Sequence, residues 1–173
     1  MTEKIIINDV ESRFSSNTNL ARAMLQKNNV GEQKNSVITY SIYEVLYLLE
    51  TKKAELLKKS KNISFEQLLK NQTKKNRNLK VKYLVFKDLK NKGHILKAGL
   101  KFGADFRVYE KGEKPQINHA KYLLYILEEK DKINIEEFCS KARVAHSTGK
   151  SLLMAIIDSE EDITYFEINW KKL

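Results

Sequence analysis

The sequence predicts an α+β protein with a small N-terminal α/β domain followed by a C-terminal domain that has a mixed sheet and flanking helices. Three helix-start patterns and several short β-branched runs support this fold class. After Gly93 the apolar residues change from helical spacing to short runs separated by glycines. The polar stretch 71–78 is typical of a boundary, and it predicts domains over 1–78 and 79–173.

The N-terminal domain is predicted from one β-branched run and two capping patterns. Ser41 and Ser64 are each followed three residues later by Glu or Gln, which is the pattern of a capping box at a helix start. The predicted elements are a strand over 3–8, a loop over 12–19, a helix over 41–59, and two helices between 64 and 93 that are separated by 71–78.

The C-terminal domain is predicted to alternate strands with one helix. Asn134 can cap the helix and Gly149 can end it in a left-handed turn, which places Lys150 at a helix-to-strand junction. Cys139, the single cysteine, excludes an internal disulfide and is expected to be a small core residue of this helix. The predicted elements are strands over 94–97, 105–109, 122–127, 151–157 and 164–170, the helix over 134–149, and a turn over 158–162.

The positive charge is concentrated in one segment. The chain has 173 residues and a formal net charge of +10, from 32 Lys and Arg against 22 Asp and Glu. Residues 51–101 alone contain 16 Lys and Arg against three acidic residues. Such a segment is either a phosphate-binding surface for nucleic acid or a solvated helix face, and charge by itself leaves both interpretations open.

Several classes of function lack support in the sequence. No apolar run approaches the ~20 residues of a membrane span, so we expect a soluble, cytoplasmic protein. No phosphate-binding glycine loop is present, and Asp88, Asp105 and Glu110 do not form a recognisable ligand array. We therefore expect neither a metal site nor a cofactor.

Three polar residues stand at special positions: Tyr109 at a strand end, His119 before the next strand, and Lys150 after Gly149. These residue types can cleave RNA without metal, because one group takes the 2′-hydroxyl proton, another protonates the leaving 5′-oxygen, and a cation stabilises the charge on phosphorus. Taken singly, a strand-end Tyr is more often a packing residue, a lone His a surface group, and a Lys a solvated charge.

The amino-acid sequence around these residues resembles that of the catalytic domain of the archaeal tRNA-splicing endonucleases. Residues 83–112 read YLVFKDLKNKGHILKAGLKFGADFRVYEKG, His119 follows, and residues 143–150 read RVAHSTGK. The resemblance covers about half of the chain, from Tyr83 to the C-terminus, and its three motifs stand in the order of the family.

The resemblance implies a catalytic triad of Tyr109 as general base, His119 as general acid and Lys150 as transition-state stabiliser. The implied reaction is a metal-independent transesterification that leaves a 2′,3′-cyclic phosphate and a 5′-hydroxyl at the exon–intron borders of a bulge-helix-bulge precursor tRNA. A tyrosine titrates near pH ~10, so Tyr109 needs cationic surroundings to act as a base.

The resemblance also implies a pair of arginines that clamp a bulge base. Arg143 stands at the first of these positions, and no arginine follows it in the chain. His146 belongs to the same motif but not to the triad, and we expect it to have a structural hydrogen-bonding role. His94 is expected to be a strand-end surface residue.

Assembly is predicted from the C-terminal hairpin. Its acidic turn is either a solvated hairpin or, by resemblance, a plug for a basic pocket of another subunit. The final strand is an edge that could pair across a two-fold axis. The resemblance implies a tetramer, either of four copies or as an α2β2 complex with a separate structural subunit. The acidic residues of the turn are Asp158, Glu160, Glu161 and Asp162.

Two other functions fit the basic composition. One is a non-catalytic RNA-binding or assembly subunit of such a complex, although the complete triad weighs against it. The other is a basic architectural protein that coats nucleic acid, which should show no preference for bulged RNA over plain duplex.

Overall fold

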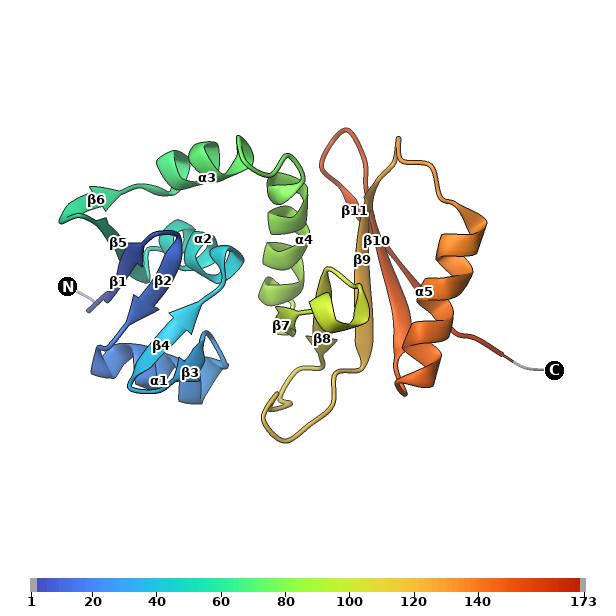
Figure 1. The fold of residues 1–173 in the computed structure, drawn as a ribbon, viewed down its shortest axis with the longest axis horizontal. Helices are drawn as coiled ribbons and strands as arrows, with labels where there is room; N and C mark the ends of the chain where they lie inside the picture. The colour runs from blue at the N-terminus through green and yellow to red at the C-terminus, as the bar shows by residue number, and fades with distance from the viewer. Residues whose placement is uncertain (1–2, 172–173) are drawn as a thin grey trace. The chain divides into compact units, whose positions relative to one another are not determined.

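The structure is a computed structural model that describes residues 3–171 (Figure 1). The chain divides into two compact units, Met1–Tyr83 and Leu84–Leu173. Each unit contains one mixed sheet and its helices, so the predicted α+β class is confirmed. Within the described residues, no helix is both long enough and apolar enough to cross a membrane.

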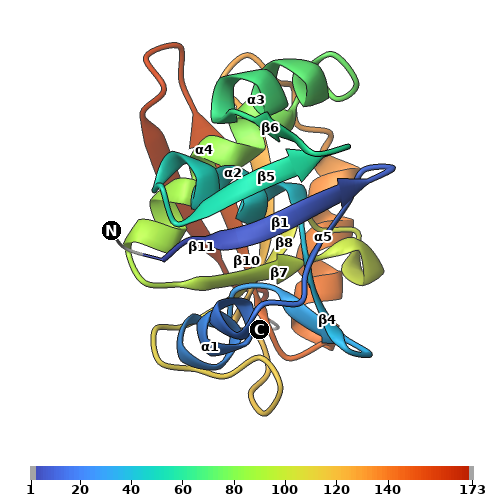
Figure 2. The same ribbon diagram turned by 90° about the vertical axis from the view of Figure 1, so that its left-hand side faces the viewer.

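The sheet of the first unit has the strand order β3-β4-β2-β1-β5-β6. Its neighbours are antiparallel except β1 and β5, which run parallel and lie side by side in Figure 2. The elements are β1 (Ile5–Val10), β2 (Arg13–Ser16), α1 (Asn19–Asn28), β3 (Glu32–Lys34), β4 (Val37–Tyr40), α2 (Ile42–Glu50), β5 (Ala54–Lys58), β6 (Lys61–Ile63) and α3 (Phe65–Thr73). Helix α4 (Leu79–Asn91) begins in this unit and ends in the second.

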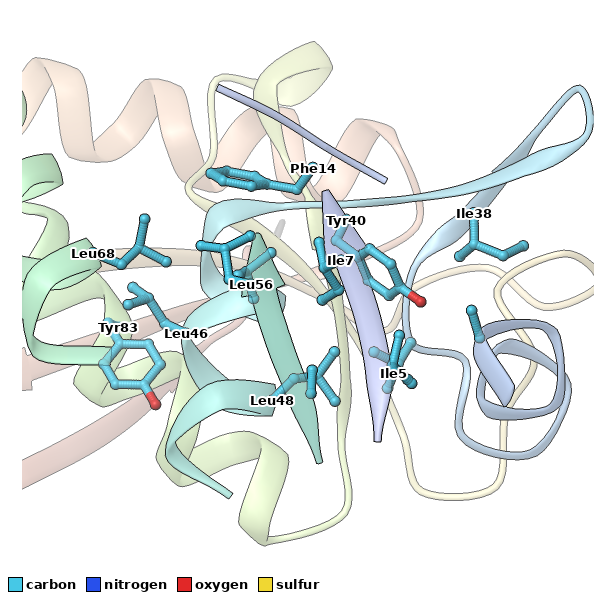
Figure 3. Close-up of a cluster of buried hydrophobic side chains, with 14 of the residues drawn as sticks. Ile5, Ile7, Phe14, Ile38, Tyr40, Leu46, Leu48, Leu56, Leu68 and Tyr83 are labelled. Carbon is cyan, nitrogen blue, oxygen red and sulfur yellow. The ribbon is translucent and has the colours of Figure 1, made fainter. Parts of the chain in front are cut away.

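The core of the first unit lies between this sheet and α2. Ile5, Ile7 and Leu56 of the paired strands are fully buried, and so are Leu46 and Leu48 of α2 (Figure 3). Burying one such side chain stabilises the fold by about 1.5–3 kcal/mol. The capping boxes predicted at the starts of α2 and α3 are both confirmed.

Two predictions for this unit are wrong. The helix expected over 41–59 ends at Glu50, and Ala54–Lys58 is a strand that pairs with β1. The chain reverses at Lys52, whose φ of 57° is left-handed and ends a helix. The loop expected over 12–19 contains β2, whose four residues pair with β1 and β4.

The sheet of the second unit has the order β11-β10-β9-β8-β7, and its strand predictions are confirmed to within about two residues. Only β9 and β10 are parallel, and α5 is the crossover that connects them. The elements are β7 (Ile95–Ala98), a short 3₁₀ turn η1 (Leu100–Phe102), β8 (Phe106–Tyr109), β9 (Tyr122–Glu128), α5 (Ile135–Ser147), β10 (Ser151–Ile157) and β11 (Ile163–Ile168).

Helices cover this sheet through two separate sets of contacts. On one side, Ala142 and Ala145 of α5 pack against Leu123 and Leu152. In addition, Phe86 of α4 packs against Phe106 of β8, with 5.7 Å between their ring centres. The sheet is therefore a buried, fixed scaffold for residues at its strand ends.

Cys139 is exposed, contrary to the prediction of a core residue. The inner face of α5 is set by Ala142 and Ala145, with Phe138 partly buried beside them. Cys139 lies off that face, and Ile135, in the first turn of α5, is 71% exposed. Small and large apolar residues alternate along this helix, so the sequence pattern does not determine which of them lie at the centre of the buried face.

Candidate active site

Three neighbouring strands bring the predicted triad segments to one end of the C-terminal sheet. Strand β8 ends at Tyr109, whereas β9 begins at Tyr122 and β10 begins at Ser151. The end of β8 lies next to the starts of β9 and β10, because β8 runs antiparallel to β9 and β9 runs parallel to β10. Lys121 joins them: its amide donates to the carbonyl of Val108 and its carbonyl accepts from the amide of Ser151, each at 3.0 Å. The loop before β9 and the turn before β10 therefore meet beside the end of β8, at the bottom of the sheet in Figure 1.

Tyr109 is the last residue of β8, and its side chain is held by packing. Only 2% of the residue is exposed, and it forms a small buried cluster with Ile95 of β7 and Ala120, which follows His119. The Nδ1 of His94 lies 3.2 Å from the Tyr109 carbonyl oxygen, so His94 has a specific contact at the strand end. The phenol is thus held in one orientation next to the segment that carries His119.

His119 is exposed in the loop of residues 110–121. Short-range hydrogen bonds shape this loop: the Glu110 amide donates to Glu113 Oε2 at 2.9 Å, and the Lys114 amide donates to Asn118 Oδ1 at 2.9 Å. These bonds order the backbone on the N-terminal side of His119. The side chain itself is open to solvent and can be reached by a substrate.

An ion pair closes the same loop at its base. Lys121 Nζ lies 2.5 Å from Glu110 Oε1, and 5.1 Å from the centre of the Tyr122 ring. The hydrogen bond to Glu110 raises the pKa of Lys121 above its usual range. The sequence considered Glu110 only as a possible metal ligand and did not indicate Lys121, because no local pattern shows that a Glu and a Lys eleven positions apart will meet.

Lys150 follows directly after Gly149, whose φ of 67° is left-handed and ends the α5 turn as predicted. The Lys150 ammonium donates to the Thr148 carbonyl at 2.7 Å and lies 5.3 Å from the centre of the Phe102 ring. Among the residues that the structure describes, no carboxylate forms an ion pair with Lys150. Its charge is thus held in place and available to an anion.

The C-terminal segment after β11 lies against the start of β10. The Ser151 hydroxyl donates to Asn169 Oδ1 at 2.7 Å, and the ring of Trp170 lies 4.7 Å from the ring of His146. His146 therefore makes a ring contact in place of the expected structural hydrogen bond. Neither Asn169 nor Trp170 was a candidate in the sequence, because nothing local indicates this long-range contact.

Arg143 is exposed on α5, four residues or about 6 Å of helical rise before the end of the helix at Ser147. It lies on the same helix end as the triad lysine. The structure therefore leaves its guanidinium accessible close to the end of α5 that carries Lys150.

The acidic turn lies at the opposite end of β10, about 20 Å along the strand from Lys150. Asp158 shapes the turn, because its Oδ1 accepts from the amides of Glu160 and Asp162 at 2.9 Å each. Glu160, Glu161 and Asp162 are exposed. The turn is therefore a separate acidic feature and not part of the triad site.

No metal centre is evident in the described part of the chain: residues 3–171 contain no group of three or more His, Cys, Asp or Glu placed to hold an ion. The segments that meet at these strand ends carry a phenol, an imidazole and two ammonium groups. Together they can exchange protons and bind a phosphate.

Comparison with known proteins identifies the family. The family described as "tRNA intron endonuclease, catalytic C-terminal domain" matches residues 79–165, which include all three triad positions. The tRNA-splicing endonuclease of Methanothermobacter thermautotrophicus is 40% identical over 153 residues, which cover 88% of this chain and 89% of that protein. The tRNA-splicing endonuclease of Pyrococcus abyssi is 33% identical over 92% of this chain and 91% of that protein. That of Methanococcus maripaludis is 35% identical over 86% of this chain and 84% of that protein. The chain belongs to the tRNA-intron endonuclease family.

Proposed function

We propose that the chain is a tRNA-splicing endonuclease that cuts precursor tRNA at exon–intron borders in bulge-helix-bulge RNA without a metal ion. The observation that carries this proposal is the meeting of the Tyr109, His119 and Lys150 segments at one end of three adjacent strands. Membership of the family supports the substrate class. The N-terminal unit supplies no residue of the triad, so the proposed chemistry belongs to residues 79–173.

In the proposed reaction the 2′-oxygen of the nucleotide before the cut attacks phosphorus. Tyr109, as phenolate, takes the 2′-hydroxyl proton, a 2′-O–P bond forms, and the P–O5′ bond breaks. His119 as imidazolium gives its proton to the leaving 5′-oxygen. The products are a 2′,3′-cyclic phosphate and a 5′-hydroxyl, and all atoms and protons balance.

Lys150 stabilises the negative charge that develops on the phosphorane oxygens. The ammonium needs no movement of a bound counter-ion for this role, because it has no carboxylate partner in the described chain. General acid or base groups of this kind each contribute about 10²–10⁴-fold to the rate.

Arg143 is proposed to stack its guanidinium on an unpaired bulge base. Its exposure and its place on the Lys150 end of α5 support this role. Stacking of this kind contributes about 1–3 kcal/mol per base. Substitution by Lys should weaken the contact, because an ammonium cannot stack as a plane.

The chain is also proposed to work as a tetramer, either of four copies or as α2β2 with a separate structural subunit. β11 is the edge of its sheet and exposes Phe166, which supports pairing with another copy. The exposed carboxylates of Glu160, Glu161 and Asp162 support docking to a basic surface of another subunit. A purified mass of four times the 20.2 kDa chain together with cleavage supports four copies, whereas an inactive dimer indicates a missing partner.

The test is cleavage of a bulge-helix-bulge RNA in the presence of EDTA. The wild-type protein should cut it, and a His119→Ala variant should lose at least about 10²-fold in rate. A 2′-deoxy substitution at the scissile nucleotide should abolish cleavage and preserve binding. A strict requirement for added Mg²⁺, full activity of the His119 variant, or a cut deoxy substrate would refute the mechanism.

A further inference from the structure

The end of α3 and the connection that follows it carry four exposed cations within eight residues. We call Lys70, Lys74, Lys75 and Arg77 the α3 basic cluster. All four belong to the N-terminal unit, so none is part of the proposed cleavage site.

The α3 basic cluster has no acidic counterpart. Between Glu66 and Asp88 the sequence contains no carboxylate at all. Within residues 3–171 none of the four side chains forms an ion pair or a side-chain hydrogen bond. Lysines elsewhere do find partners, such as Lys4 with Glu55 at 2.9 Å. The four charges therefore repel one another, and no direct ion pair in the described chain neutralises any of them.

Helix electrostatics explain only part of the cluster. Cations near a helix C-terminus are stabilised by the helix dipole, which accounts for Lys70 in the last turn of α3. Lys75 and Arg77 lie beyond the helix, where this effect falls off. The next helix, α4, begins at Leu79 with no acidic residue in its first turn. Its positive end adds to the local potential and does not compensate it.

The composition of the surface favours a nucleic-acid backbone over a protein partner. Amide side chains alternate with the cations, at Asn71, Gln72, Asn76 and Asn78. Among the described residues, no large exposed hydrophobic side chain lies between residues 64 and 80. Protein interfaces need an apolar centre, whereas phosphate contacts are made by Lys, Arg, Asn and Gln side chains.

We propose that the α3 basic cluster binds the phosphate backbone of RNA through residues other than those proposed for cleavage. The proposal rests on the proposed function for the class of partner, because RNA is its substrate. It gives the N-terminal unit a role in affinity and none in chemistry. Such contacts are independent of base sequence and weaken with salt, because each neutralised phosphate releases bound counter-ions.

The experiment measures binding of an intron-containing precursor tRNA transcript from 50 to 300 mM salt. The test variant replaces the four residues of the cluster by Gln in the full chain. The matched control replaces four scattered, exposed lysines of the same unit by Gln, which removes the same charge: Lys27, Lys34, Lys52 and Lys53. Circular dichroism confirms that both variants are folded.

The cluster variant should bind about 10–100-fold more weakly at 0.1 M salt, and its slope of log K against log salt should fall by about 3. The control variant should lose much less affinity for RNA, and its salt slope should fall much less. Single-turnover cleavage at saturating protein should keep the wild-type rate, because none of the four residues has a role in the proposed chemistry.

Two outcomes overturn the proposal while the cleavage activity stands. One is an unchanged salt slope in the cluster variant. The other is a changed oligomeric mass with an unchanged slope, which would assign the cluster to a subunit contact. If the wild-type protein binds RNA with the expected slope but never cleaves it, the proposed function fails and the RNA-binding surface survives.

Discussion

Gly149 offers a sensitive test of how the turn before β10 positions Lys150. Its φ is 67°, and a Cβ atom added there meets nothing within 4 Å. A substitution by Ala is therefore opposed only by backbone strain, which costs about 1–2 kcal/mol in the left-handed region. Ala also reduces the conformational entropy of the unfolded chain, which offsets about 0.4–1 kcal/mol of this cost. The free energy of unfolding should therefore fall by about 1 kcal/mol.

The consequence can be measured in two assays. A loss of 1 kcal/mol lowers the melting temperature of a unit of this size by about 4–8 °C. If the turn relaxes to relieve its strain, the Lys150 ammonium moves, and small misplacements at a reacting centre can cost up to about 10²-fold in rate. Single-turnover cleavage by Gly149→Ala should therefore be slower than that of the wild type.

Matched variants distinguish a loss of protein stability from a displacement of the Lys150 ammonium. Gly103 has a φ of 65° and equally open space, so Gly103→Ala carries the same strain on a different turn. Gly149→Asn should be nearly neutral, because Asn tolerates this backbone and already adopts it at Asn29, with a φ of 53°. Equal stability of Gly149→Ala and wild type, or equal cleavage rates for the two Ala variants, would refute the reasoning.

Tyr40→Phe should leave stability unchanged or raise it by up to about 1 kcal/mol, because the buried Tyr40 hydroxyl has no hydrogen-bond partner among residues 3–171. Tyr83→Phe should cost about 1–3 kcal/mol, because the Tyr83 hydroxyl donates to Glu50 at 2.6 Å, and urea unfolding with the opposite ranking contradicts this. Burial raises the pKa values of Tyr40, Tyr83 and Tyr165 above the usual 10. The stability that these neutral hydroxyls contribute is therefore complete below pH 10 and is lost as the pH rises further. In an alkaline absorbance titration these tyrosines should ionise only as the protein unfolds, and a single step for all tyrosines near pH 10 counts against the assignment. Lys121→Met and Glu110→Gln should each change stability by less than about 1 kcal/mol, as is usual for exposed ion pairs, and should slow cleavage by similar factors. The exchanged pair Glu110→Lys with Lys121→Glu should recover the rate, and no recovery would indicate that Lys121 binds phosphate directly.

Local chemistry made much of the fold predictable. The side chains of Ser41, Ser64 and Asn134 satisfy free amides within their own first helical turn, so a few adjacent residues are enough to identify each helix start. The same holds for Gly149, because only a few residue types tolerate its backbone. The proposed triad residues were identified by resemblance to the family's motifs, since a motif preserves residue types and order.

Pairing between distant segments was not predictable in this way. Leu56 fits the helical spacing that continues from α2, yet it lies in β5 because the parallel partner, β1, is 49 residues earlier in the chain at Ile7. A strand gains its hydrogen bonds from another strand, and the spacing of its own residues does not identify that partner.

The sequence by itself determined the helix starts, the left-handed turn before Lys150, the concentration of positive charge and the residue types of the site. Only the tertiary structure decided that the end of β8 lies beside the starts of β9 and β10, that Glu110 meets Lys121, and that Trp170 contacts His146. The physical reason is range: capping and turn preferences act within about one helical turn, whereas strand register and side-chain packing depend on the fold as a whole.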